Sequence, residues 1–186
     1  MLFFEEIKSN PIIAAIKKLD QLDEALNSPC KNIFLLTGNI FNLKGICCRI
    51  KSKNKNLYIN VDLINGFSRD TWGLEYIVKN VPLDGIITTK THLVKLSKDL
   101  GAFTIQSLFV SDSTSLCEGI NALNVSKPNV VEILPGIMPK VIKRVKMETN
   151  IPIIAGGLIM DREDIQQSLS SGALAVSTSN RSIWYT

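Results

Sequence analysis

The sequence predicts one α/β domain over residues 1–186: a compact (β/α)8 barrel of the TIM type, in which some helices are shortened. Short apolar runs alternate with helix-like segments, and about eight such units recur at a period of about 23 residues. The chain has 186 residues, which fits one domain. This is slightly short for a closed barrel, so some helices must be clipped. An open, doubly wound sheet is the rival architecture.

Each expected strand is a run of four to eight residues rich in Ile, Val and Leu. Most runs lack alternation with polar residues, which is typical of parallel strands that are buried on both faces. These properties favour a parallel sheet with helices packed around it. In chain order the expected strands are Pro11–Ile16, Ile33–Leu36, Leu57–Val61, Gly85–Thr88, Phe103–Val110, Val130–Leu134, Ile151–Ala155 and Ala173–Val176.

The segments between these runs predict helices. Asp70–Asn80 opens with Asp and Thr and then places apolar residues at helical spacing. Pro139 begins another helix, since proline is favoured in a first turn. Asp161–Asp164 opens a third with acidic residues that the helix dipole favours. The weakest helical pattern is that of Leu43–Lys55. Strands that alternate with helices in this way imply parallel crossover units.

Composition and charge narrow the class of protein. The formal net charge of +4 permits an anionic partner without requiring one. Four cysteines without a CxxC pair and the single His92 do not supply a zinc site, so no metal is expected. No apolar run approaches the ~20 residues of a membrane span. Because Glu5 and Glu6 follow the N-terminal apolar residues, we expect no signal peptide and a cytoplasmic location.

The ends of the last two strands predict a phosphate site. Gly156 and Gly157 directly follow a buried strand, where glycines let the backbone approach a ligand closely. The next strand ends in Ser177, Thr178 and Ser179, which add three hydroxyl groups. The loops after strands 7 and 8 form the common phosphate site of these barrels. The alternative is a tight turn beside a polar strand edge.

Other strand ends carry polar groups that can read the hydroxyls of a small ligand. The candidates are Asp62, Lys90, Gln106, Glu132 and Gly136. Each one singly can also have a purely structural role. Asp62, Lys90 and Glu132 can make an acid–base set, and Lys90 can form a Schiff base. No local motif marks either chemistry, so we assign no catalytic residue.

Two basic segments are candidates for contact with a nucleic acid backbone. Lys51, Lys53 and Lys55 lie in a stretch without an acidic residue. Lys140, Lys143 and Arg144 follow Pro139 and share one face of the expected helix. Such clusters suit RNA phosphates, but they are equally typical of a solvated, lysine-rich surface. No RNP motif, arginine-rich arm or helix-turn-helix pattern accompanies them.

Together these strand ends resemble those of the glycerol uptake operon antiterminator regulatory proteins. The Glu132–Gly136 segment and the Ser-Thr-Ser run that precedes Trp184 are the most specific parts of the resemblance. Two positions depart from the pattern, since Asn60 stands where a histidine is expected and Ser107 where an arginine is expected. The matching runs, which start at Pro11–Ile16, are Leu57–Gly66, Gly85–Lys90, Ile105–Gln106, Val131–Pro139, Ile151–Gly157 and Ala175–Ser179.

The resemblance implies a regulator and not an enzyme. Its effector would be glycerol 3-phosphate, without a cofactor, and its partner the leader mRNA of glycerol-catabolism transcripts; a homo-oligomer is compatible with this role. In this hypothesis the two phosphate loops hold the phosphate, Asp62, Gln106 and Glu132 orient the hydroxyls, and Lys90 supplies charge. An enzyme of triose or sugar phosphates, and a ligand-binding module whose target is a protein, are the alternatives.

Overall fold

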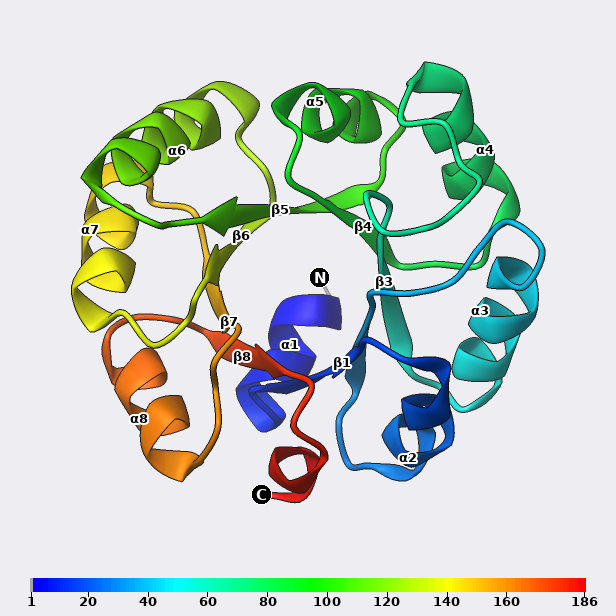
Figure 1. The fold of residues 1–186 in the computed structure, drawn as a ribbon, viewed down its shortest axis with the longest axis horizontal. Helices are drawn as coiled ribbons and strands as arrows, with labels where there is room; N and C mark the ends of the chain where they lie inside the picture. Colours follow the sequence, from blue (N-terminus) through cyan, green and yellow to red (C-terminus); the bar gives the residue numbers. More distant parts are fainter. Residues whose placement is uncertain (1) are drawn as a thin grey trace.

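A closed barrel of eight parallel strands forms the centre of the molecule (Figure 1). The structure, a computed structural model, describes residues 2–186. The strands pair in sequence order and β8 closes the ring against β1, which confirms the predicted barrel and excludes an open sheet. The strands are β1 (Ile12–Ile16), β2 (Asn32–Leu35), β3 (Asn56–Asn60), β4 (Gly85–Thr88), β5 (Phe103–Phe109), β6 (Val130–Leu134), β7 (Ile153–Gly156) and β8 (Ala175–Thr178).

An outer ring of helices covers the strands (Figure 1). The ring fits a short chain because its first helix, α2, has only six residues, as the predicted shortening requires. Asp70, Asp112 and Asp161 each accept a backbone N–H in the first turn of the helix that follows, so the acidic residues before these helices are N-caps. The elements are α1 (Leu2–Ser9), α2 (Leu22–Asn27), α3 (Leu43–Ser52), α4 (Thr71–Asn80), α5 (Thr91–Asp99), α6 (Ser113–Ser126), α7 (Pro139–Thr149) and α8 (Arg162–Ser170), with 3₁₀ helices η1 (Leu19–Gln21) and η2 (Arg181–Tyr185).

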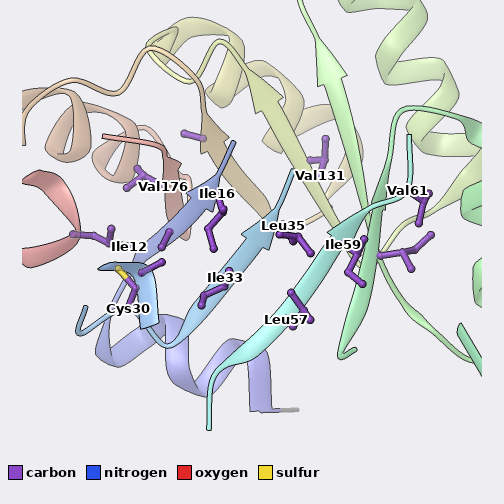
Figure 2. Close-up of a cluster of buried hydrophobic side chains, with 14 of the residues drawn as sticks. Ile12, Ile16, Cys30, Ile33, Leu35, Leu57, Ile59, Val61, Val131 and Val176 are labelled. Atoms are coloured by element: carbon purple, nitrogen blue, oxygen red, sulfur yellow. The ribbon is translucent and has the colours of Figure 1, made fainter. Parts of the chain in front are cut away.

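Side chains alternate along the strands between two separate cores. One set points outward and packs against the helices, and Figure 2 shows part of it around Ile12, Ile33 and Leu57. The other set, which includes Ile13 and Phe34, points into the barrel. This alternation decides which side chain at the end of each strand can reach the interior of the barrel.

An N-terminal helix, which the sequence pattern did not reveal, closes one end of the barrel. In Figure 1 α1 lies within the ring of strands. Its Phe3 and Ile7 are buried, and Phe3 packs edge-on against Tyr58 inside the barrel. The opposite end, where the strands finish, stays free for a ligand. Within residues 2–186, no helix is long and apolar enough to cross a membrane.

Candidate functional site

A cavity of about 590 Å³ opens at the end of the barrel where the strands finish. It is lined by the ends of every strand except β4, or by the segments that follow them, and has both polar and apolar walls. Ligand sites in barrels of this type lie at this end. Its lining residues are Ala15, Lys17, Leu36, Asn60, Leu63, Ser107, Phe109, Glu132, Leu134, Gly157, Leu158, Ile159, Met160, Ser177, Thr178, Ser179 and Asn180.

The structure brings the two expected phosphate loops together at this cavity. Gly156 pairs with Ser177 across neighbouring strands, so the chain segments that follow β7 and β8 leave the sheet side by side. Gly157 has a φ of 75° and Leu158 a φ of 59°. The left-handed region suits glycine but strains a leucine, and strained backbone of this kind is frequent at ligand sites. The turn is therefore a candidate for ligand binding.

Of the three hydroxyl groups expected to bind phosphate, two are already engaged. Ser177 Oγ donates a hydrogen bond to Glu132 Oε1 at 2.6 Å. Thr178 faces the other side of the strand, and its Oγ1 donates to the carbonyl oxygen of Ile159 at 3.0 Å. The hydroxyl of Ser179 has no hydrogen-bond partner among residues 2–186. Ser179 is therefore the hydroxyl that is free to meet a ligand.

Glu132 forms the floor of the cavity. It lies on the inner face of β6, is only 5% exposed, and accepts hydrogen bonds from Ser177 and, at 2.8 Å, from Ser107 Oγ. Burial raises the pKa of its carboxyl, while the two hydroxyls and the charge of Lys17 oppose this shift. The floor is thus a buried carboxyl group whose oxygens are oriented by two serines.

Three polar residues that line the cavity were not among the ligand contacts expected from the sequence. Lys17 follows β1 directly and continues the inward face of Ile13 and Ala15, but it makes no ion pair with residues 2–186. Asn60 and Ser107 were noted as departures from the family pattern, and both line the cavity. The two-residue alternation along each strand is the signal that identifies all three.

Three polar candidates do not line this cavity, and their expected role as ligand contacts stays a prediction. The Asp62 carboxylate accepts hydrogen bonds from Thr88 Oγ1 and from the backbone N–H of Thr89, so it ties β3 to β4. Lys90 is the N-cap residue of α5 and does not line the cavity. Gln106 points outward from β5, and its Oε1 accepts a hydrogen bond from Ser126 of α6. Asp62, Lys90 and Glu132 therefore do not form one acid–base set at this cavity.

Gly136, the last of the polar candidates, packs closely against β7. A Cβ atom there would lie 2.7 Å from the backbone of Ala155 and of Gly156. Its N–H donates to the carbonyl oxygen of Gly157, and its own carbonyl accepts from Ser168 Oγ. Both backbone groups are used within the protein, so Gly136 supports the turn at Gly157 from behind.

The two basic clusters lie on different helices at different ends of the barrel. Lys51 and Lys53 are at the C-terminal end of α3, near the strand starts, and Lys51 is paired with Asp84 at 2.6 Å. Lys55, expected as an RNA contact, is buried and donates to the carbonyl oxygens of Ser28 and Cys30, which corrects that expectation.

The second cluster belongs to α7, whose first turn lies at the cavity end of the barrel. Lys140 and Lys143 are exposed there, whereas Arg144 is paired with Glu148 at 2.7 Å. Among residues 2–186, no group of three His, Cys, Asp or Glu side chains is placed to hold a metal ion.

We predict that Glu132→Gln stabilises the protein without ligand, by on the order of 1 kcal/mol at neutral pH, because it removes a carboxyl group whose ionisation is made costly by burial. Since the folded-state pKa is raised, the cost of ionising Glu132 is absent below the unfolded-state pKa. It grows as pH rises to the folded-state pKa and is then constant. Urea unfolding of both proteins from pH 4 to 8 should show that the extra stability of Glu132→Gln increases with pH in the same way.

The matched control is Glu118→Gln, which removes an exposed carboxylate on α6. Its effect on unfolding should stay within about 0.5 kcal/mol at every pH. A destabilised Glu132→Gln protein at pH 8 would contradict the idea that the buried charge is costly.

Comparison with known proteins identifies the family of this chain. The model of the family "Glycerol-3-phosphate responsive antiterminator" matches residues 12–184. The chain belongs to this family. The resemblance in the sequence is thereby confirmed, and membership indicates a glycerol uptake operon antiterminator and supports a regulatory, non-enzymatic role.

Relatives agree with this assignment over nearly the whole chain. The Escherichia coli protein YgcP is 38% identical over 178 residues, which are 96% of this chain and 93% of YgcP. The crystal structure of a glycerol uptake operon antiterminator regulatory protein from Listeria monocytogenes superposes with a TM-score of 0.91 at 30% identity, covering 94% of this chain and 95% of that one. The crystal structure of a glycerol uptake operon antiterminator-related protein from Thermotoga maritima superposes with a TM-score of 0.83 at 30% identity, covering 93% of this chain and 96% of that one. Aldolases and orotidine 5′-phosphate decarboxylases at 10–19% identity share the fold alone.

Proposed function

We propose that this antiterminator is gated by glycerol 3-phosphate, which binds in the cavity at the open end of the barrel. The liganded protein would bind the leader mRNA of glycerol-catabolism transcripts and prevent early termination. The observation that carries the proposal is the convergence of both phosphate loops and Lys17 on one cavity of about 590 Å³. That volume lies within the usual range for small-molecule sites.

The phosphate group would lie between the loops that follow β7 and β8. Backbone N–H groups at Gly157 and Ser179 and the free Ser179 hydroxyl supply donors for its oxygens. Lys17 supplies positive charge, because β1 pairs with β8 and Lys17 emerges beside the Ser177–Ser179 segment. Lys17 would therefore take over the charge that we expected from Lys90 or from an arginine at position 107.

The glycerol end would lie over Glu132. The carboxyl oxygens of Glu132 accept hydrogen bonds, so they favour a ligand that donates hydroxyls. A ligand with a second anionic group is disfavoured here, because burial beside a carboxyl group makes a further negative charge costly. Asn60 and Ser107 complete this part of the wall. We therefore expect glycerol 3-phosphate to bind better than 3-phosphoglycerate, which carries a carboxylate.

A thermal-shift series tests the ligand directly. Glycerol 3-phosphate at a hundred times its dissociation constant should add about 2.7 kcal/mol of stability. For a chain of this size that is a rise in Tm of about 5–10 °C. Glycerol alone should have little effect. If no phosphate ester shifts the Tm, the proposed site is wrong.

Lys17→Ala should weaken glycerol 3-phosphate binding by about 10- to 100-fold, because it removes a charge-assisted contact to phosphate. Isothermal titration calorimetry measures this change. The control is Lys18→Ala, the next residue along the chain, which is exposed and does not line the cavity. Equal losses in both variants would indicate a general charge effect and not a contact at the site.

A further inference from the structure

Large apolar side chains are exposed on the loops around the cavity. Three are aromatic: Phe41 after β2 is 96% exposed, Trp72 at the start of α4 is 78% exposed, and Phe109 at the end of β5 is 64% exposed. We call these three residues the aromatic arc. Exposed apolar surface of this kind marks an interaction site. Phe41 and Trp72 do not line the cavity, so neither is needed to hold a ligand there.

The loop that carries Phe41 is held in one conformation. A parallel bridge joins Asn39 to Asn65, and the N–H of Ile40 donates to the carbonyl oxygen of Asn65 at 3.0 Å. The loops after β2 and β3 are thus one hydrogen-bonded unit. Trp72 is fixed in the first turn of α4, which Asp70 caps through the N–H of Gly73 at 2.9 Å. Aromatic side chains on a rigid support lose little entropy when a partner binds.

The same part of the rim carries basic side chains. Lys44, Arg69 and Lys90 lie at the starts of α3 and α5 or in the loop before α4, and none forms an ion pair within residues 2–186, although Arg69 donates to the carbonyl oxygen of Asp62 at 2.6 Å. The carboxylates of Asp62 and Asp70 are held in place by hydrogen bonds from backbone N–H groups. A partner at this rim therefore meets aromatic faces flanked by cations.

We propose that the aromatic arc is the surface on which this protein binds single-stranded RNA, with bases stacked on Phe41 and Trp72. The inference rests on the proposed RNA-binding function and assigns its location. Single-stranded RNA exposes unstacked bases that pack on aromatic side chains, and its phosphates require nearby cations. This combination favours RNA over a protein partner, which would not need the three basic side chains beside exposed aromatic faces.

The arc also connects the RNA surface to the ligand. Phe109 and Leu63 are exposed on the rim and line the cavity as well. A ligand in the cavity would contact Phe109 and Leu63 and set the positions of their side chains on the rim that the RNA meets. By linkage, RNA must tighten glycerol 3-phosphate binding by the factor by which the ligand tightens RNA binding.

The test compares RNA binding by full-length variants in saturating glycerol 3-phosphate. The probes are a fluorescent leader transcript of a glycerol-catabolism operon and the same transcript annealed to its complement. Phe41→Ser and Trp72→Ser should each weaken binding to the single-stranded form by about 5- to 150-fold, as expected when one stacked base is lost. Calorimetry should show unchanged glycerol 3-phosphate affinity in the absence of RNA, since neither residue lines the cavity.

Two controls separate the arc from the rest of the surface. Met147→Ser removes an equally exposed apolar side chain at the far end of α7 and should not affect RNA binding. Lys44→Ala should reduce the slope of log affinity against log salt by about one, whereas Lys53→Ala at the other end of α3 should not.

The possible failures are distinguishable. If the unaltered protein binds neither probe, both the proposed function and the arc are overturned. If it binds and the serine variants bind equally well, or if Lys53→Ala alone reduces the salt slope, only the arc is overturned. Unchanged RNA affinity with a changed mass in light scattering would instead show that the arc joins copies of this chain.

Discussion

Replacing Trp184 by alanine should lower the free energy of unfolding by about 3–5 kcal/mol, because it empties a large site in the core. Trp184 lies in η2 and is fully buried. Its Nε1–H donates to the carbonyl oxygen of Thr178 at 2.8 Å, and its own carbonyl oxygen accepts from the thiol of Cys30. The side chain therefore fixes the end of β8, where the proposed phosphate loop begins.

Urea unfolding, monitored by far-UV circular dichroism, measures this loss. Trp184→Phe keeps most of the packing and removes only the hydrogen bond, so we expect a smaller loss of about 1–3 kcal/mol. The neighbouring Tyr185 is 53% exposed, and Tyr185→Ala serves as the surface control. If Trp184→Ala were no less stable than this control, the C-terminal segment would not be part of the core.

The sequence was sufficient for the barrel because its strands are buried on both faces. Continuous apolar runs located all eight strands, with small shifts such as β8, which begins at Ala175 and not at Ala173. The starts of α4 and α8 could also be predicted, because each helix follows an aspartate that caps its own first turn. In contrast, α1 is held by contacts of Phe3 with residues more than fifty positions away, such as Tyr58. No local pattern contains that information.

The site was only partly predictable, because a residue's place at a strand end does not say which face it occupies. Ser107 and Gln106 are adjacent, yet Ser107 faces the cavity and Gln106 faces α6. Counting inward from Ile105, which belongs to the inner core, would have chosen Ser107. The same rule selects Lys17. Burial of a cation such as Lys55 is different, since it depends on the carbonyl groups of Ser28 and Cys30, which are distant in sequence.

Gly156→Ala should produce the largest loss of ligand binding, about 100-fold or more for glycerol 3-phosphate, together with about 1–3 kcal/mol of destabilisation from overpacking. A Cβ atom at this position would lie 2.5 Å from Ser177 Oγ and 2.6 Å from Glu132 Oε1. Neither distance is tolerable, so the Ser177 and Glu132 side chains must shift to make room for the methyl group. The new methyl group and the displaced carboxylate would then occupy the floor of the cavity.

Calorimetric titration with glycerol 3-phosphate separates the loss of affinity from the loss of stability, if it is done without urea and at a temperature at which the variant is folded. Gly45→Ala is the matched control, because a Cβ atom there meets nothing within 4 Å and the residue lies inside α3. That exchange should raise stability by about 0.5–1 kcal/mol and leave ligand affinity unchanged. A folded Gly156→Ala protein with normal affinity would show that the ligand does not approach Glu132. Glu132, Ser107 and Ser177 would then have a structural role, in which their hydrogen bonds to one another hold the strands together.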